Sequence, residues 1–510
     1  MKRSSWLLLP SLAVVALAGV PVACISSTSA PPASEDSGAP QGTDAGPQGN
    51  DATPPSDSGP GPGDAAVDTG TDAGPQPLTL TVLLNGAPES GVNVVFQDDT
   101  GAPISTSQTG TNGTVSQLVV AGSQVTVVLG TQQNPNLVTI QDVAPGDALT
   151  VVDTSASTSP PPFDYQVVTT LPAGSWDAAA VAERVTVGAC SDPIAYPVYL
   201  QPGCQSGGVF PLLATALDDT TDLEVAYTYQ TGNPLIPDGG LPDGDTTIPV
   251  VVTRPWSTST VSATISATNL PPLPVDAGAQ GGYSATLIEV SGGIATSSSA
   301  GSPGGYDAGA QSNPFVVHSG YPDFVQAETL ADRDSVYSSV VAFIGGATRS
   351  ATPPASQTIP FDLSTLPLFN GTSILSDDGG VPAQPTVTWT TTGSLSAAAG
   401  IYISAQWNAS SVTDAGTTYT NGTWTIIAPP TATSVQAPAL SSPVAAWAPP
   451  AGASWNMPRM AAVQGSFFPG YPAFRAQVAT LPLLQGYEIV VPLLPANGTI
   501  YVSGIYPNEG

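Results

Sequence analysis

The sequence predicts an all-β protein, made of tandem β-sandwich domains behind a disordered N-terminal tether. The 510 residues include 54 Pro and 53 Gly, which break helices and favour turns. Short segments rich in Val and Thr alternate apolar and polar residues, a pattern typical of half-buried strands. The composition also changes abruptly at Leu78, where a polar stretch gives way to apolar alternation.

Residues 1–23 have the features of a secretory signal peptide. A charged start, Lys2 and Arg3, precedes an apolar run from Trp6 to Val20. This order of parts is typical of an export signal that is removed from the mature protein. No later apolar run reaches the roughly 18 residues that a membrane-spanning helix needs. We therefore expect an exported protein without a membrane-spanning helix.

Cys24 follows this signal and resembles the cysteine of a bacterial lipobox. Val22 and Ala23 fit the last two positions before that cysteine, although Pro21 does not fit the first. The resemblance implies that Cys24 carries a lipid, which is then the only link to a membrane, at the outer membrane or the cell surface. The alternative is cleavage at the small residues 16–18, which leaves Cys24 as a thiol near the new N-terminus.

Residues 24–77 are expected to form the disordered tether. From Ile25 to Pro77 the chain is dominated by Ser, Pro, Gly, Ala, Thr, Gln and Asp, and it contains no Lys, Arg or aromatic residue. Low hydrophobicity and charge of one sign keep such a segment unfolded. The sequence Asp-Ala-Gly-Pro-Gln occurs at 44–48 and again at 72–76, as in a low-complexity spacer.

The charge balance argues against nucleic acid as a partner. The chain has 8 Lys and Arg against 38 Asp and Glu, and a net charge of -30. Such a surface repels nucleic acid and anionic lipid headgroups. A protein or a glycan remains open as the partner.

Residues 78–153 are expected to form the first β-sandwich. Turn residues such as Asn85-Gly86 separate short alternating strands at 78–84, 92–96, 113–120, 125–129 and 137–140. The order Asn-Gly-x-Pro, Gly-Val-x-Val-x-Phe, Thr-x-x-Gly-Thr and Ala-Gly-x-x-Val-Thr-Val resembles the carboxypeptidase regulatory-like domains, which share a transthyretin-like or immunoglobulin-like sandwich. The resemblance implies a non-enzymatic module for display or spacing and transfers no catalytic residue.

The remaining chain is expected to form β-rich domains at 154–275 and 283–510. Strands are predicted at 181–190, 210–217, 223–229, 250–253, 261–268, 283–290, 336–344, 386–389, 401–407, 423–427, 487–491 and 499–503. Asp-Ala-Gly-Ala-Gln at 276–280 and 307–311 has the composition of the tether. We therefore predict a disordered insertion at 297–312.

The three cysteines are accounted for if Cys190 pairs with Cys204 and Cys24 is lipidated. A disulfide across this loop would stabilise an exported domain by roughly 3 kcal/mol. The alternative is two separate buried thiols. Two cysteines and one distant histidine cannot fill a zinc site.

Four residues are the candidates for acid–base chemistry, but none is expected to be catalytic. His318 is the only histidine, so a Ser–His–Asp site would have to use it, yet no Gly-x-Ser-x-Gly segment precedes a helix. Glu224 and Glu289, with Glu488, lie on predicted strands and could act as paired carboxylates of a glycoside hydrolase. Solvent-facing strand positions explain each glutamate equally well.

Two further groups are candidate ligand sites. Asp238, Asp243 and Asp245 could offer oxygen ligands to calcium, the one cofactor considered, although Asp-Gly is also ordinary turn chemistry. Trp256, Trp389, Trp407, Trp424, Trp447 and Trp455 could include a sugar-stacking surface, but in a sandwich they are better explained as packing.

These observations together favour a non-enzymatic, lipid-anchored surface protein that serves display, adhesion or envelope structure. A surface carbohydrate-binding module is the alternative, and an anchored carboxylate-dependent glycoside hydrolase is the third possibility.

Overall fold

The computed structural model describes residues 76–84, 86–153, 165–175, 181–187, 198–200, 208–221, 223–234, 247–273, 280–301, 309–334, 340–351, 357–375, 384–413, 416–450, 452–456, 458–477, 484–485, 488–489, 494 and 496–507. The expected signal peptide, Cys24 and the expected tether up to residue 75 lie outside these ranges.

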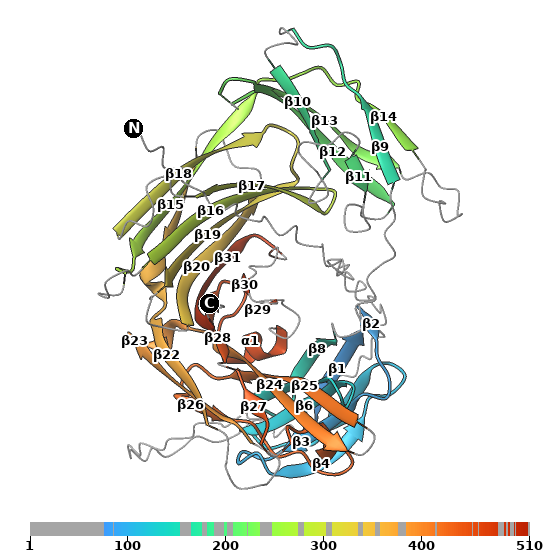
Figure 1. Cartoon of the computed structure of the whole chain (residues 1–510), viewed down its shortest axis with the longest axis vertical. Helices are drawn as coiled ribbons and strands as arrows, with labels where there is room; N and C mark the ends of the chain where they lie inside the picture. Colours follow the sequence, from blue (N-terminus) through green and yellow to red (C-terminus); the bar gives the residue numbers. More distant parts are fainter. Residues whose placement is uncertain are drawn as a thin grey trace, which may run out of the picture. The chain divides into compact units, whose positions relative to one another are not determined.

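This described part is all-β, as predicted (Figure 1). Its strands form seven sheets. The helical elements found there are α1 (Tyr471–Gln477) and the 3-10 turns η3 (Leu363–Thr365), η4 (Leu395–Ala397) and η5 (Ala445–Trp447). Frequent Pro and Gly interrupt helices, while the alternating Val, Ile and Thr residues suit a pleated surface with one buried face.

The largest sheet has 13 strands. Along its path they are β17 (Ile294–Gly301), β16 (Gln280–Ser291), β19 (Phe324–Asp334), β20 (Val340–Ala351), β31 (Gly498–Pro507), β28 (Arg459–Gly465), β24 (Gly400–Thr413), β25 (Gly416–Ala428), β7 (Pro135–Val143), β6 (Ser123–Gly130), β3 (Asn93–Gln97) and β4 (Pro103–Gln108), with β27 (Ser454–Trp455) beside β24. Neighbours on this path are antiparallel except β25 and β7, which run parallel.

The N-terminal strands build a two-layered sandwich, as predicted. A second sheet contains β1 (Leu78–Leu84), β2 (Ala87–Pro88), β5 (Thr114–Gln117) and β8 (Ala148–Asp153). Gly86, with φ 83°, provides the turn between β1 and β2. Leu78, Leu80 and Val82 alternate along β1, and all three are buried against the apolar face of β3 and β6. The period-two pattern of β1 thus forms one wall of the core.

The expected boundary at residue 153 does not separate two hydrophobic cores. β7 pairs with β25 from Thr423↔Asn136 to Ile427↔Ile140, so both halves of the chain contribute to one sheet. The core of the N-terminal sandwich also contains Phe343, Ile427 and Val502. The division between 78–153 and 283–510 is therefore corrected: β7 would be an edge strand in an isolated sandwich, and β25 satisfies its free backbone groups.

A separate small sandwich is formed within residues 165–252. One of its sheets contains β10 (Val181–Thr186), β12 (Val209–Asp218) and β13 (Glu224–Pro234), and the other contains β9 (Tyr165–Thr170), β11 (Val198–Leu200) and β14 (Thr247–Val251). Val185, Phe210, Leu212, Ile248 and Val250 are buried in its core.

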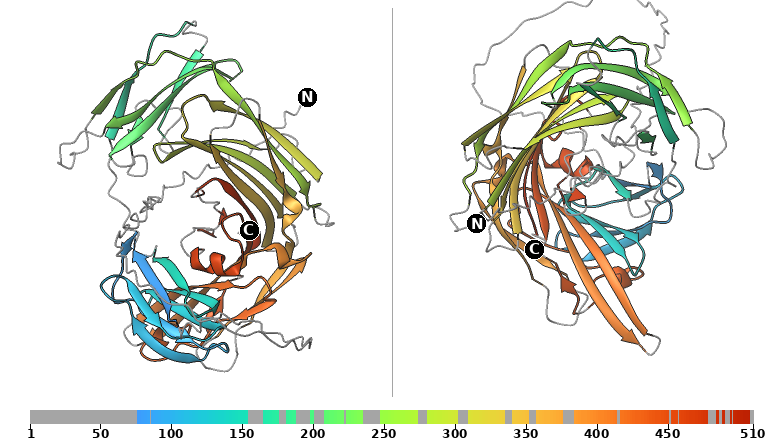
Figure 2. Two further views of the ribbon diagram at one scale, coloured as in Figure 1. Left: turned by 180° about the vertical axis from the view of Figure 1, so that it is seen from behind. Right: turned by 45° about the horizontal axis from the view of Figure 1, so that its top comes forward.

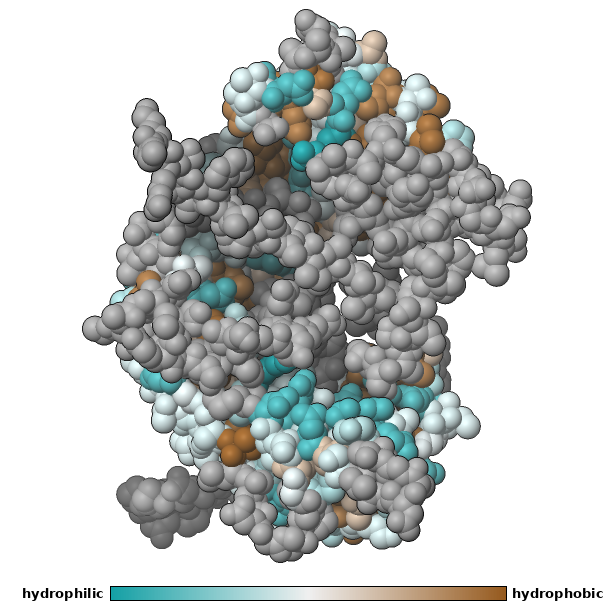
Figure 3. Space-filling view, in the orientation of Figure 1, coloured by the Kyte–Doolittle hydropathy of each residue, from teal (hydrophilic) through white to brown (hydrophobic). Residues whose placement is uncertain are grey.

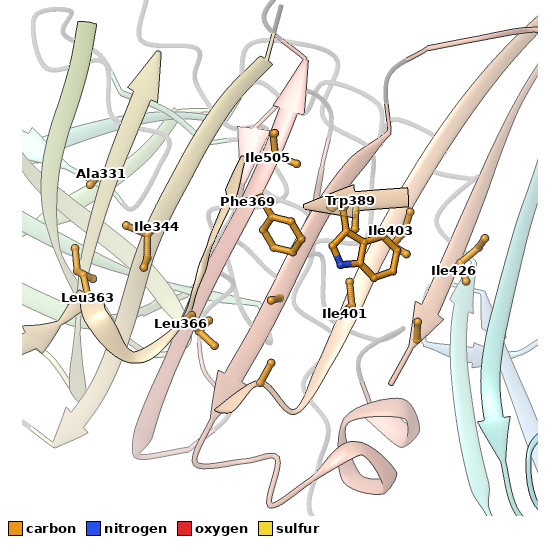
Figure 4. Close-up of a cluster of buried hydrophobic side chains, with 14 of the residues drawn as sticks. Ala331, Ile344, Leu363, Leu366, Phe369, Trp389, Ile401, Ile403, Ile426 and Ile505 are labelled. Carbon is orange, nitrogen blue, oxygen red and sulfur yellow. The ribbon is translucent and has the colours of Figure 1, made fainter. Parts of the chain in front are cut away.

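Two three-stranded sheets pack on the large sheet and enclose the largest core. They are β15 (Thr260–Leu270), β18 (Gly309–His318) and β21 (Gln357–Asp362), and β22 (Leu368–Leu375), β23 (Thr386–Thr392) and β26 (Ser434–Gln436). Figure 4 shows Phe369 and Trp389 close to Ile401, Ile403 and Ile505 of the large sheet. A short hairpin of β29 (Leu484–Gln485) and β30 (Glu488–Ile489) forms the remaining sheet.

The prediction of a disordered insertion at 297–312 is wrong for most of its length. Residues 297–301 belong to β17, which pairs with β16, and residues 309–312 belong to β18, which pairs with β15. Main-chain hydrogen bonds make these ladders, so a segment of Ser, Ala and Gly can form a strand when its neighbours supply partners and a core. Residues 302–308 lie outside the described ranges.

The hairpin of β24 and β25 is long and continuous, from Ile401↔Ala428 to Thr413↔Gly416. It is the orange hairpin in the right-hand view of Figure 2.

On the face seen in Figure 3, the described residues are a mixture of hydrophilic and hydrophobic side chains. Scattered apolar exposure of this kind is usual for folded proteins.

Candidate functional site

The structure brings together three residues that the sequence offered for acid–base chemistry: Glu224, Glu289 and His318, here called the Glu–His–Glu cluster. The Nδ1 atom of His318 lies 2.6 Å from Oε2 of Glu289, and its Nε2 atom lies 3.0 Å from Oε2 of Glu224. The backbone N–H of His318 also donates to Oε1 of Glu289 over 2.8 Å. Both ring nitrogens and the main chain of His318 are therefore engaged by carboxylates.

Strand geometry explains how Glu289 becomes buried. Tyr283, Ala285, Leu287 and Glu289 alternate along β16, and all four lie on its buried face. His318 ends β18, whose sheet packs on that face, while Glu224 begins β13 in the small sandwich. The cluster thus joins strands of three different sheets.

A shell of tyrosines surrounds the cluster. The ring of Tyr227 lies edge-on to His318 at a centroid distance of 4.7 Å, and Tyr321 lies at 6.2 Å. The hydroxyl of Tyr227 lies within hydrogen-bonding distance of the carbonyl oxygens of Ser259 (2.6 Å) and Ser319 (2.9 Å), so these two acceptors share its single proton. Tyr321 contacts Tyr229 at 5.5 Å. These rings exclude water from the carboxylate–imidazole contacts and so strengthen them.

Burial by itself would lower the pKa of His318, but the two neighbouring carboxylates have the larger, opposite effect. Hydrogen bonds and charge from Glu224 and Glu289 raise the pKa of His318 to about 9. The ring is therefore an imidazolium at neutral pH. Burial also raises the pKa of Tyr321 to about 12, so its phenol stays neutral over the same range.

The arrangement suits charge pairing and not hydrolysis. A glycoside hydrolase holds its two carboxylates about 5–10 Å apart across the scissile bond. Here the imidazole of His318 fills the space between Glu224 and Glu289. A nucleophile–histidine site needs one ring nitrogen directed at a hydroxyl, whereas both nitrogens of His318 face carboxylates. The chemistry available to the cluster is the stabilisation of a buried cation that links strands.

The expectation that the glutamates face solvent is wrong for Glu289, which is 6% exposed. In the sequence, Glu289 follows Tyr283, Ala285 and Leu287 at alternate positions of one strand, and this spacing could have predicted that it is buried. A buried carboxylate needs a partner, and the sequence has few cations to offer. Glu488 lies on β30.

The tryptophans behave as packing residues, as expected. Trp407 and Trp424 are each 1% exposed, and Trp389 is 8% exposed. Trp455 packs on Trp407 at a centroid distance of 5.4 Å, with the ring planes tilted by 49°. The Nε1 atom of Trp424 donates to Oγ1 of Thr139 over 2.9 Å. These rings do not form a coplanar exposed platform.

Several sequence candidates lie outside the described residues. They are Cys24, Cys190, Cys204, Asp238, Asp243 and Asp245. Within the described ranges, no three His, Cys, Asp or Glu side chains are grouped so that they could hold a metal ion. In the same ranges, no helix has the length and apolar character needed to cross a membrane.

A second polar feature is a cavity of about 330 Å³, well separated in sequence from the cluster. Four glutamines and two aspartates are among the residues that line it, contributed by the turn after β3, the ends of β6 and β7, and the segments around β26. The full lining is Asp99, Thr100, Gly122, Gln124, Gln141, Asp142, Gln384, Pro429, Ser434, Val435, Gln436, Ala437 and Pro438. Nothing in the sequence marked these glutamines as neighbours.

Comparisons with known proteins give limited similarity. No protein-family model and no curated protein matches the chain. Among solved structures, it is similar to the Bacillus anthracis TIE protein, with 10% identity, coverage of 56% of this chain and 50% of that one, and a TM-score of 0.13. The chain thus spans half the length of that protein.

Two other solved structures show similarity of the same order. A putative adhesin from Bacteroides ovatus has 10% identity, coverage of 62% of this chain and 95% of that one, and a TM-score of 0.11. The alpha-2-macroglobulin of E. coli has 9% identity, coverage of 74% and 26%, and a TM-score of 0.10.

Proposed function

We propose that the chain is a non-enzymatic, lipid-anchored surface protein whose β-rich body serves display, adhesion or envelope structure. The observation that carries the proposal is the Glu–His–Glu cluster. The only histidine and two of the eight glutamates, the groups best suited to acid–base catalysis, are used to join strands of three sheets. This use favours a structural role for the cluster over a catalytic one.

The surface location is supported by the sequence alone. The charged and apolar N-terminus favours export, and the lipobox-like segment ending at Cys24 favours a lipid anchor. One acyl chain binds a membrane only marginally, so stable anchoring takes more than one chain or an additional contact.

The residues that the sequence offered for the two alternatives do not support them. A tryptophan-based carbohydrate-binding surface needs exposed rings, whereas Trp407 and Trp424 are buried. A glycoside hydrolase that uses Glu224 and Glu289 would have to place its substrate where the imidazole of His318 lies.

Lipid attachment is tested by labelling cells with a fatty-acid probe. We expect the full-length chain to incorporate label and to fractionate with membranes. Cys24→Ala should lose the label and leave the membrane fraction, while Cys190→Ala, a matched control, should keep both. Unchanged label in Cys24→Ala would refute the anchor.

The absence of catalysis is tested separately. The purified chain should not hydrolyse a panel of chromogenic glycosides. Turnover that disappears in Glu289→Gln while the variant remains folded would overturn the non-enzymatic proposal.

A further inference from the structure

The polar cavity beside β26 has the size and the chemistry of a small binding site. Its volume of about 330 Å³ lies at the lower end of the range of about 300–1,000 Å³ that is usual for small-molecule sites. Side chains from segments far apart in sequence converge on it, including Gln124 of β6, Gln141 of β7 and Gln436 of β26. This size suits a single sugar ring with its hydroxyl groups.

Gln124 supplies a hydrogen-bond donor to the wall of the cavity. Only 8% of the residue is exposed. Its Oε1 atom accepts from Nε2 of Gln141 over 3.3 Å, but its own Nε2 atom makes no hydrogen bond to another described residue. Because Gln124 lines the cavity, this amide N–H group can donate to a ligand that enters it.

Gln141 is fixed in orientation by its neighbours. Its Nε2 atom also donates to the carbonyl oxygen of Gln436 over 3.3 Å, which directs its remaining amide oxygen as an acceptor. The side chain of Gln436 is exposed at the rim of the cavity. The lining thus presents both donors and acceptors, as hydroxyl groups require.

Asp142 adds an accessible carboxylate to the lining. Its backbone is left-handed, with φ 53°, a conformation that Asp tolerates better than most residues. Arg475 of α1, which is buried, donates to the carbonyl oxygen of Asp142 and pairs with Asp147 over 2.6 Å. The side chain of Asp142 remains 55% exposed, with its Oδ2 atom 3.9 Å from Arg475. The backbone of Asp142 is thus held by α1, while its carboxylate stays accessible at the cavity.

We propose that this cavity binds a neutral, hydroxyl-rich glycan unit. The amides can donate to and accept from sugar hydroxyls, and Asp99 and Asp142 can each accept from adjacent hydroxyls. The lining contains no Lys or Arg, and the chain has a net charge of -30, so anionic sugars are disfavoured. This inference rests on the surface protein proposed above and adds a ligand class to it. Glycan binding itself does not require the lipid anchor.

The test uses the full-length chain on an array of neutral and anionic glycans, followed by calorimetric titration of the best neutral oligosaccharide. Gln124→Leu and Asp142→Asn should each weaken binding at least tenfold. Because Gln124 is buried and its replacement affects folding as well, Gln436→Leu at the exposed rim provides an independent variant with the same expected direction. Gln108→Leu is the matched control, since Gln108 is exposed on β4 and pairs with Asn93 away from the cavity.

Two results would overturn the proposal. One is that no neutral glycan binds, including the case in which only calcium gives a calorimetric signal. The other is neutral-glycan binding that survives unchanged in Gln436→Leu and Asp142→Asn. Either result leaves the fatty-acid labelling of Cys24 unaffected, so the failure of this site and the failure of the anchor are distinguishable.

Discussion

His318 makes the stability of the protein depend on pH. Its pKa is raised to about 9 in the folded protein, above the ordinary value of 6.5, so the folded state binds its proton more tightly than the unfolded state. The stabilising contribution is complete below pH 6.5 and is lost as the pH rises through 9. The groups facing His318 are Glu224, Glu289, Tyr227 and Tyr321, with the charge of Asp323 close to Tyr321.

We therefore expect the free energy of unfolding to fall between pH 6.5 and pH 9, by on the order of 3 kcal/mol from this group. Urea unfolding at a series of pH values measures the change. His318→Gln should be less stable than the wild type at pH 6, and its curve should lack the decline assigned to this group. A variant curve parallel to that of the wild type would contradict the assignment.

Glu224→Gln tests the unequal burial of the two carboxylates. The side chain of Glu224 is 19% exposed, against 7% for Glu289. Removal of the more exposed partner should cost less stability than Glu289→Gln, which also loses the hydrogen bond to the backbone N–H of His318. Thermal unfolding of the two variants at pH 6 compares them, and equal losses would contradict the inferred geometry.

Glu328 is a second residue that makes stability depend on pH, but here the charged form opposes folding. Burial raises the pKa of Glu328 to about 7, although Nε2 of Gln326 donates to its Oε1 atom over 2.7 Å. Because the pKa of Glu328 is raised, the contribution of its protonated form to stability is complete below the ordinary pKa of 4.5. This contribution is lost as the pH rises through 7.

Glu328→Gln should therefore stabilise the protein at pH 8, by about 1–3 kcal/mol after allowance for the partial exposure of the side chain, and should have little effect at pH 4. Denaturant unfolding at the two pH values checks this. Glu183→Gln, an exposed position on β10, is the control and should change stability by no more than about 0.5 kcal/mol. A variant no more stable than the wild type at pH 8 would argue against a buried charge at Glu328.

Residue roles could be predicted from the sequence only in part. The tryptophans were expected to pack, because a sandwich with few charged residues must bury large apolar side chains somewhere. The partnership of Glu289 with His318 was not predicted, since the two residues lie on different sheets and nothing in their spacing sets the packing of those sheets. The glutamines of the cavity escaped prediction for the same reason.

At the scale of elements, the hairpin of β24 and β25 depends on the close approach of Gly422 to Trp407. A Cβ atom at Gly422 would lie 1.9 Å from Cζ2 of Trp407, so the ring packs directly on the glycine backbone. Gly422→Ala must displace the ring or the strand, and we expect a loss of about 2–3 kcal/mol. Calorimetry of thermal unfolding measures it.

Gly371→Ala in β22 is the matched control for this substitution. The nearest atom to a Cβ atom at Gly371 is Oγ1 of Thr390 at 3.8 Å, an ordinary contact. The control should retain a melting temperature close to that of the wild type. Equal losses in the two variants would indicate a general cost of alanine in strands and not the packing of Trp407.

Strands with clear alternation were predicted well, and featureless strands were not. The strand predicted at 78–84 coincides with β1. The prediction was possible because the apolar residues Leu78, Leu80 and Val82 alternate with polar ones and so indicate one buried face. β17 was missed since its segment is mostly Ser, Ala and Gly, residues that carry little pattern of their own. Its ladder comes from the pairing with β16, which is a tertiary property.

At the scale of the whole molecule, the shared sheet makes the N-terminal sandwich depend on the C-terminal strands. A chain ending at Ala399 would lack β24, β25, β28 and β31, and would expose the apolar faces that these strands cover. We expect its strands β3, β6 and β7 to lose protection from amide hydrogen exchange.

A chain that starts at Gln76 is the control, because it retains every described residue. Its peptides from residues 123–143 should remain as protected as in the full-length protein. If the same peptides were equally protected in the chain ending at Ala399, the N-terminal sandwich would be an independent folding unit after all.

The all-β class of the fold could be predicted from composition and from the alternation of apolar residues. The pairing of N-terminal strand β7 with C-terminal strand β25 could not. Parallel pairing of β7 with β25 brings Ile140 beside Ile427, and no local signal specifies a pairing over such a sequence separation. The resemblance of residues 78–153 to a small domain favoured an early boundary, whereas the shared sheet extends across it.

The pairing of β7 with β25 also sets the order in which the protein can mature. Strands β3, β6 and β7 are synthesised early, but the edge of β7 has no native partner until residues up to 427 have followed. Contacts over such a sequence separation form slowly, and an open strand edge can pair with other chains in the meantime. An assisting factor that shields this edge until residue 427 is available would therefore raise the yield of the folded protein.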